Sequence, residues 1–205
     1  MESKTIGLIF ASLVTMVIIV AAAFVLMGDG NEPSDTPEQN QTPETNPIDI
    51  YIGDLPIGST MTFETSGTYT YGSYVYTLSG TEEYKVISKT SASISFEVNG
   101  TIYASYGGQK ITFSKSNGDI KTWDLTDKHE PSEKGVLETS FGVVNVKKVV
   151  WNLPSKVGDI KITDLGSSQF WSESGYGLKQ MMNYMSNTGE SVKSTKTLID
   201  IEVKE

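Results

Sequence analysis

The pattern of hydrophobic and polar positions divides the chain into three parts. Residues 6–27 form one apolar run without a charged side chain, residues 28–47 are polar and rich in Pro, and residues 48–205 contain many short segments in which apolar and polar residues alternate. Alternation with a period of two is typical of β-strands that bury one face. The pattern predicts three parts: an anchor at 1–27, a spacer at 28–47 and an all-β domain at 48–205.

Short strand-like segments follow one another through the third part, and Gly, Asn and Pro separate them. No helical pattern lies between most of them, which favours an antiparallel meander that forms a strongly curved sheet or partial barrel. The dipeptides Asn99-Gly100 and Asn117-Gly118 carry the residue types of two-residue hairpin turns. We expect a hairpin at each, with Val98 paired to Thr101 at the first and a bulge beside the second.

The segment 177–186, GLKQMMNYMS, fits two patterns. Its apolar residues have the i, i+3, i+4, i+7 spacing of one helix face: Leu178, Met181, Met182 and Met185. However, the segment is short for a helix and lies between the turn-like sequences SGYG and NTGE, which favours a strand. We predict a strand, with a helix as the alternative.

The apolar run at 6–27 is long enough to cross a membrane. At about 1.5 Å per helical residue it spans a hydrocarbon core of roughly 30 Å. Lys4 precedes the run and Asp29 follows it, so the positive-inside rule places the N-terminus in the cytoplasm and the remainder outside. A cleavable signal peptide is the alternative, but its apolar region is usually only about 7 to 15 residues long. We therefore expect a single-pass protein of the cell membrane.

The spacer at 28–47 combines four Pro and five acidic residues and has no aromatic residue. Such a composition does not support a packed core, and it predicts a disordered, extended acidic stalk. Asn40 begins the sequon NQT, and Asn99 begins the sequon NGT. Both are candidate glycosylation sites, although a tight turn is the simpler explanation of Asn99-Gly100.

The composition excludes several kinds of site. The chain has no Cys, which rules out disulfides and thiolate metal ligands, and His129 is the one His. A net charge of -9 argues against nucleic-acid binding, because phosphate contacts need a basic face. We expect neither a metal nor a cofactor.

Two groups of side chains are candidates for ligand binding. The first is the tyrosines of one Tyr-rich segment, which would offer a stacking surface: Tyr69, Tyr71, Tyr74 and Tyr76. The alternative is that these rings line a half-buried strand face. The second group is Met181, Met182 and Met185, whose thioethers suit soft metals but more often fill core gaps.

The segment 124–133 is acidic and contains His129, but it lacks the spacing of a calcium loop or of a zinc-protease motif. A solvated loop is the expected structure. No grouping of Ser, His and acid marks a hydrolase, so we expect a non-catalytic protein and keep a hydrolase that uses His129 as a remote alternative.

The C-terminal third carries a recurring pattern: ETSFGVVNVKKVVWNL, then FWSESGYGLKQMMNYMSNTGE, then TKTLIDIEV. It resembles membrane-anchored archaeal surface β-domains of unknown function and, more distantly, the curved sheets of the periplasmic lipoprotein-carrier family. The resemblance implies an exported curved sheet without a catalytic signature, and its carrier side implies a lipid-like ligand.

These observations together predict a membrane-anchored, extracytoplasmic binding or interaction module of the cell envelope. Its expected partners are the membrane, through the N-terminal helix, and an envelope protein or a lipid-like ligand. The alternative is a carrier or sensor that holds a lipid-like ligand in a pocket of the curved sheet.

Overall fold

The computed structural model describes residues 46–126 and 131–205. The predicted membrane anchor, Asn40 and His129 lie outside the described residues. None of the helices in the described ranges is long and apolar enough to span a membrane. Asn46 and Pro47, the last two residues of the predicted spacer, already belong to the folded part, since the Asn46 side chain donates a hydrogen bond to the Phe141 carbonyl at 3.0 Å.

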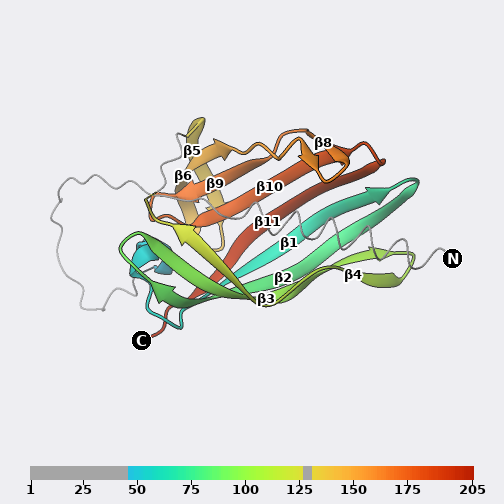
Figure 1. Ribbon diagram of the computed structural model, residues 1–205. Helices are drawn as coiled ribbons and strands as arrows, with labels where there is room; N and C mark the ends of the chain where they lie inside the picture. Colours follow the sequence, from blue (N-terminus) through green and yellow to red (C-terminus); the bar gives the residue numbers. More distant parts are fainter. Residues whose placement is uncertain (1–45, 127–130) are drawn as a thin grey trace.

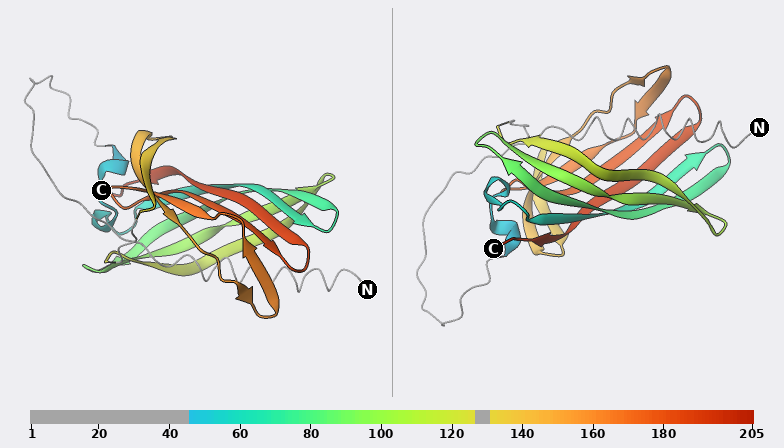
Figure 2. Two further views of the ribbon diagram at one scale, coloured as in Figure 1. Left: turned by 90° about the horizontal axis from the view of Figure 1, so that it is seen from above. Right: turned by 60° about the horizontal axis from the view of Figure 1, so that its bottom comes forward.

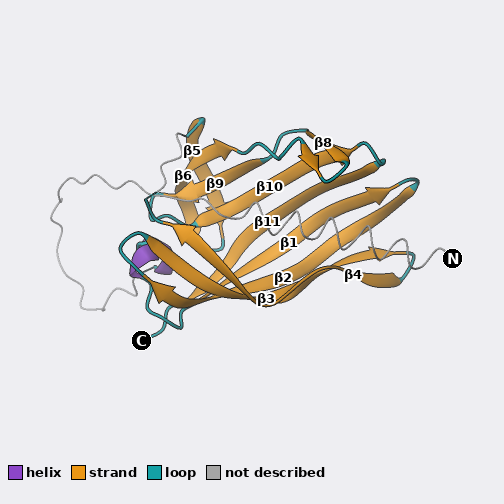
Figure 3. Ribbon diagram, in the orientation of Figure 1, coloured by secondary structure: helices purple, strands orange, loops and turns teal. Residues whose placement is uncertain are grey.

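The described chain is an antiparallel sheet with two short 3-10 helices, η1 (Pro47–Asp49) and η2 (Ile52–Asp54) (Figures 1 and 3). Its strands are β1 (Thr60–Tyr71), β2 (Tyr74–Lys89), β3 (Ser93–Tyr106), β4 (Gln109–Asp124), β5 (Glu133–Thr139), β6 (Gly142–Val150), β7 (Lys156–Val157), β8 (Ile160–Asp164), β9 (Ser168–Ser172), β10 (Gly177–Ser186) and β11 (Glu190–Glu202). The all-β prediction is confirmed, and so is the predicted strand at 177–186.

The main path of the sheet runs in the order β4-β3-β2-β1-β11-β10-β9-β6-β5, with β8 paired to β10 and to β7. Two runs of neighbouring hairpins therefore meet where the first strand of the chain pairs with the last, from Thr60 opposite Glu202 to Tyr71 opposite Glu190. The path ends at β4 and at β5, so the sheet is strongly curved but not closed (Figure 2).

The predicted turn at Asn99-Gly100 is wrong, because β3 continues through both residues. Gly100 lies opposite Glu82 of β2, and a Cβ at this position would come within 2.2 Å of the Thr81 carbonyl oxygen. This glycine serves a close approach of two strands, whereas the hairpin turn lies further on at Gly107-Gly108, between Tyr106 and its partner Gln109.

The predicted turn at Asn117-Gly118 is also wrong, although the expected bulge is present. β4 runs through the dipeptide, and the pairing with β3 shifts between Val98 and Asn99. Gly118 has a φ of 78°, which suits a residue without a Cβ. Its backbone N–H donates to the Asn99 side-chain oxygen at 2.8 Å, so the two Asn-Gly pairs build one bulge instead of two turns.

Three glycines let the sheet bend where β1, β2 and β3 cross its middle. Added Cβ atoms at Gly67, Gly80 and Gly100 would each lie 2.1–2.2 Å from a backbone carbonyl oxygen of the adjacent strand. Gly67 pairs with Leu78, and Gly80 pairs with Ile102, so the glycines lie on a diagonal across the three strands. Inward-facing glycine is a known device for sharp sheet curvature.

Two apolar clusters fill the concave face on either side of this diagonal. The helix-end cluster lies beside η1 and η2 and comprises Ile48, Ile52, Leu55, Met61, Phe63, Tyr84, Val86, Ile94, Phe96, Val98, Trp123, Leu125, Val146, Tyr176, Leu178, Leu198 and Ile201. The hairpin-end cluster lies toward the β1–β2 and β3–β4 turns and comprises Tyr69, Leu78, Ile102, Ala104, Phe113, Ile162, Tyr184 and Val192. The sheet therefore has two small cores.

The curvature brings together strands that are distant in the sheet order. Trp123 of β4 and Trp171 of β9 contact each other edge-to-face, with ring centroids 6.2 Å apart and an interplanar angle of 79°. We call this line of approach the seam. In the described residues β4 pairs with β3 only, so side chains, and not a strand ladder, bridge the seam.

Candidate functional site

The concave face has two neighbouring hollows between the clusters. The larger has a cavity volume of about 80 Å³, and the smaller about 50 Å³. Tyr84, Gln180 and Lys196 line both, so these side chains form the partition between them.

The larger hollow is apolar toward the hairpin end and polar toward the partition. Its apolar wall consists of Leu78, Ile102, Phe113, Met182, Tyr184 and Val192. Its polar wall contains Glu82, Ser116, Lys121 and Lys196. The smaller hollow lies on the other side of the partition, where Phe63, Trp123 and Trp171 line it.

The polar wall is one hydrogen-bonded group, which we call the charged cluster: Glu82, Tyr84, Ser116, Lys121 and Lys196. The Lys196 ammonium pairs with the Glu82 carboxylate and also donates to the Tyr84 hydroxyl at 2.7 Å. Lys121 donates to the same hydroxyl oxygen at 2.8 Å, and Ser116 donates to Glu82 at 3.3 Å. Three strands, β2, β4 and β11, thus contribute to the cluster, which depends on the curvature for its assembly.

Burial and charge act in opposite directions on the ionisable groups of the cluster. Burial alone would raise the pKa of Glu82, but the ammonium groups of Lys196 and Lys121 and the Ser116 hydroxyl lower this pKa below its usual value. Burial lowers the pKa of Lys196 against the opposing pull of Glu82. Burial raises the pKa of Tyr84 to about 12 despite the nearby Lys121, so Tyr84 is neutral at physiological pH.

Aromatic faces complete the surroundings of the two ammonium groups. Lys196 lies 4.5 Å from the ring centroid of Tyr84 and 5.0 Å from that of Phe63, while Lys121 lies 5.0 Å from Tyr84. Such cation–π contacts stabilise a positive charge in a partly dry site. The cluster thus holds two cations and one carboxylate beside an apolar wall.

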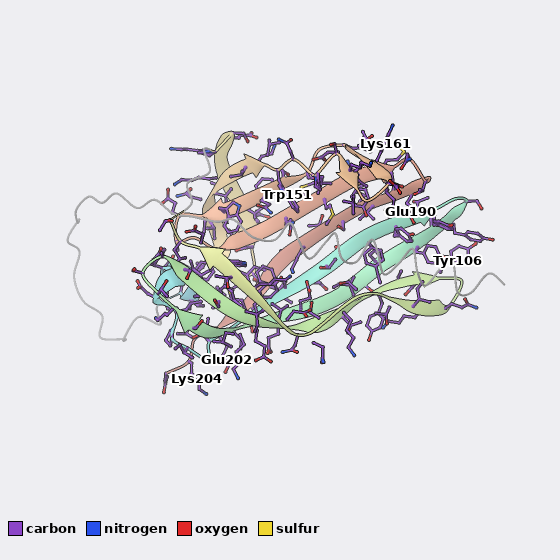
Figure 4. The ribbon with its side chains drawn as sticks, viewed as in Figure 1. Tyr106, Trp151, Lys161, Glu190, Glu202 and Lys204 are labelled. Carbon is purple, nitrogen blue, oxygen red and sulfur yellow. The ribbon has the colours of Figure 1, made fainter. Side chains whose placement is uncertain are left out.

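A second buried polar group lies at the hairpin end of the sheet. Figure 4 shows Glu190 and Tyr106 at this end, and Glu202 and Lys204 at the other end of the molecule. Glu190 is fully buried. Its carboxylate accepts hydrogen bonds from the Tyr69 hydroxyl and the Thr188 hydroxyl, at 3.2 and 3.3 Å. These contacts anchor the β10–β11 turn to β1.

The predicted tyrosines divide between core and surface. Tyr69 is buried in the hairpin-end cluster, and Tyr71 and Tyr76 pack against that cluster. Tyr74 is exposed and contacts Tyr106 edge-to-face. The four rings therefore do not form one exposed stacking stripe, and none of them lines either hollow.

The three predicted methionines do not converge, because 177–186 is a strand and neighbouring side chains alternate between its faces. Met182 points inward and lines the larger hollow. Met181 and Met185 belong to the opposite face, and Met185 is exposed. Met182 is therefore the one predicted methionine that can contact a ligand in the hollow. The three thioethers do not lie together, so they do not form a metal site.

Other predicted positions have local structural roles. Asn99 is half-buried and accepts the hydrogen bond that stabilises the bulge at Gly118, while its amide donates to Glu97 at 3.2 Å. Asp124 accepts hydrogen bonds from Thr126. Among the described residues no group of three His, Asp or Glu side chains is placed to hold a metal ion.

The charged cluster was not predicted from the sequence. One signal was present: in the alternating stretch Leu78, Gly80, Glu82, Tyr84 and Val86, a carboxylate occupies an inward position. Lys196 likewise precedes Leu198 at the same spacing on β11. An acid and a base that interrupt two apolar faces are candidates for a buried pair, but their pairing requires knowledge of the sheet order.

Comparisons with known proteins leave the family of this chain open. No family model matches the sequence, and the search of curated proteins finds no match. A remote similarity links the chain to the solved structure of DynF from the dynemicin biosynthesis pathway of Micromonospora chersina, with 12% identity, coverage of 88% of this chain and 95% of that chain, and a TM-score of 0.33.

Two further solved structures have lower scores. A DUF1329 family protein from Desulfovibrio piger shows 9% identity and a TM-score of 0.22, and a LolA superfamily protein from Nitrosomonas europaea shows 11% identity and a TM-score of 0.20. Both similarities cover 74% of this chain and 88% of the other chain. Scores at this level assign neither family nor function.

Proposed function

We propose that the protein is a non-catalytic binding module that holds a small ligand with an apolar body on the concave face of its sheet. The larger hollow carries this proposal. It combines an apolar wall with a few convergent polar groups, which is the usual composition of a small-molecule site.

The size of the hollow restricts the ligand. A cavity of about 80 Å³ exceeds several times the space that one water molecule needs, but it is well below the several hundred Å³ of a large ligand pocket. The ligand of this proposal is therefore a short lipid-like molecule or the end of a longer one. An interaction with an envelope protein would instead use the outer faces or the hairpin tips.

The proposed location of this activity rests on the N-terminal sequence alone. We propose that residues 6–27 anchor the chain in the cell membrane and that the sheet lies outside, joined by an acidic stalk. Protease added to intact cells would then degrade the sheet domain. Protection of this domain until the cells are lysed would overturn the topology.

Photo-crosslinking tests the binding site. The full chain is reconstituted in vesicles and exposed to a neutral alkyl alcohol that carries a diazirine, and the labelled peptides are identified by mass spectrometry. We expect labels on β2, β3 and β4 near Leu78, Ile102 and Phe113. The Thr65→Phe variant places a ring in the hollow and should reduce this labelling at least about fivefold, on the order expected when a small apolar site is filled.

A matched control is available on the same strand. Ser66 is the next residue of β1 and is exposed, so Ser66→Phe adds the same ring to the outer face. The Ser66→Phe protein should be labelled at the hollow to the same extent as the unmodified chain. Equal labelling of the Thr65→Phe and Ser66→Phe proteins, or labels confined to the outer face, would contradict the proposed site.

A further inference from the structure

We propose that the ligand of the larger hollow carries one negative charge, and that a carboxylate-type head group lies against Lys121 and Lys196 while its apolar part extends toward the hairpin end. This inference rests on the proposed binding function and specifies the chemical class of the ligand.

The charge balance of the cluster is the first argument. Two ammonium groups, from Lys121 and Lys196, face one carboxylate, from Glu82, so the cluster carries one unbalanced positive charge. The described contacts of Lys121 within the cluster are with the hydroxyl and the ring of Tyr84, and neither group carries a negative charge. A positive charge beside an apolar wall is costly without a counter-charge. One bound monoanion would neutralise the cluster.

The geometry of the ammonium groups is the second argument. The Nζ atoms of Lys121 and Lys196 both lie within 2.8 Å of the same Tyr84 oxygen. Two donors that converge on one oxygen are close enough to be bridged by the two oxygens of a carboxylate, in charge-assisted hydrogen bonds. The Tyr84 hydroxyl, which also has a proton to donate, would become a third contact for the head group.

The direction of the apolar part follows from the order of residues along the strands. On β2 the cluster residue Glu82 precedes Tyr84, and the apolar Leu78 lies toward the hairpin turn. Ile102 of β3, opposite Gly80, continues this wall. On the other side of the partition the contact between Trp123 and Trp171 bridges the seam. An alkyl chain bound at its head to the cluster would therefore extend toward the hairpin end.

Competition between matched ligands tests this inference on the unmodified chain. Decanoate, decanol and decyltrimethylammonium have similar apolar parts and head groups of different charge. Each is used to displace the neutral diazirine probe from the full chain in vesicles. We expect decanoate to displace the probe at a free concentration on the order of tenfold lower than decanol, with the cation weakest, as charge-assisted contacts predict.

Substitutions on β4 locate the effect. Lys121→Met removes the unbalanced cation but leaves the Glu82–Lys196 pair, so the ratio between the concentrations of decanol and decanoate that displace the probe should fall to about one. Lys121→Arg keeps the charge and should retain the preference. Lys115→Met removes a charge from an exposed position of the same strand and should leave the preference for decanoate unchanged. Circular dichroism checks that each variant is folded.

Each outcome decides one question. Equal displacement by decanoate and decanol, with the probe still bound at the hollow, would overturn the anionic head group and leave the binding function standing. If decyl phosphate, at a pH where it is a dianion, displaced the probe at a lower concentration than decanoate does, the proposal that the ligand carries a single negative charge would be overturned. Failure of the probe to label the hollow at all would remove the binding function itself.

Discussion

The two ends of the concave face are built from the same strands but packed differently. At the helix end η1, η2 and the contact between Trp123 and Trp171 cover the sheet, and Phe96 lies fully buried beneath them. At the hairpin end a smaller cluster lies beside the larger hollow, and Phe113 retains 8% of its exposure. The helix end is packed as a core around Phe96 and borders only the smaller hollow, whereas the hairpin-end cluster forms the apolar wall of the larger one.

The boundary between the two ends explains this difference. The glycine diagonal bends the strands, and the charged cluster occupies the inward positions directly beside it. A buried ion pair is weak evidence for stability, since desolvation opposes the attraction between its charges. We infer that the helix end supplies most of the folding free energy and that the middle of the sheet is adapted to binding.

Truncation of one phenylalanine at each end tests this division most strongly. Phe96→Ala should lower the free energy of unfolding by about 4 kcal/mol, because it opens a cavity in a closed core. Phe113→Ala should cost about 2 kcal/mol, since its ring borders a hollow that water can enter. Urea unfolding followed by tryptophan fluorescence measures both. Equal losses would show that the two ends are packed alike.

The glycine diagonal predicts the next largest effect. Gly80→Ala places a Cβ about 2.1 Å from the Thr101 carbonyl oxygen, and the strands must separate to accommodate it. We expect a loss of about 3 kcal/mol. Gly135→Ala on β5 is the matched control, because no atom lies within 4 Å of the added Cβ. If both variants unfolded at the same urea concentration, the glycine would not be required for the curvature.

Alkaline titration gives the smallest and most specific comparison. Burial raises the pKa of Tyr84 to about 12, against the pull of Lys121, whereas for Tyr184 burial and the charge of Glu190 both raise the pKa. A raised tyrosine pKa contributes stability that is complete below pH 10 and is lost as pH rises through the folded-state value. Each such tyrosine should reduce stability by about 1 kcal/mol per pH unit above 10.

The order of ionisation follows from the same causes. Tyr84 should ionise before Tyr184, because Lys121 opposes the effect of burial on the pKa of Tyr84, whereas Glu190 adds to the effect of burial on the pKa of Tyr184. Tyrosinate absorbance of the Tyr84→Phe and Tyr184→Phe variants assigns the two transitions. The reverse order would mean that the opposing effects of Lys121 on Tyr84 and of Glu190 on Tyr184 are absent in solution.

The sequence was sufficient for the fold class because strand periodicity is a local property. The alternation along 93–98 and the turn-like flanks of 177–186 identified strands that the structure confirms. The Asn-Gly dipeptides led to two wrong turn predictions, because the same residue types suit more than one structure. They occur in tight turns, and they also occur where a strand bends or bulges beside a closely approaching strand. Only the neighbouring strand, through the Asn99 side chain and the Thr81 carbonyl, decides between them.

The candidate site could not be predicted from local sequence patterns for a different reason. Glu82 and Lys196 are far apart in the chain and meet because β1 lies between β2 and β11. That order depends on the pairing of the first strand with the last, which no short segment encodes. The Tyr and Met candidates were chosen by residue type alone, and only Met182 reaches the hollow.

The seam between β4 and β9 has a kinetic consequence. Opening it would separate the rings of Trp123 and Trp171, but in the described residues it would break no backbone ladder, since β4 pairs only with β3. Side-chain rearrangements are much faster than the separation of hydrogen-bonded strands. A molecule that entered through this line would pass between side chains, without partial unfolding of the sheet.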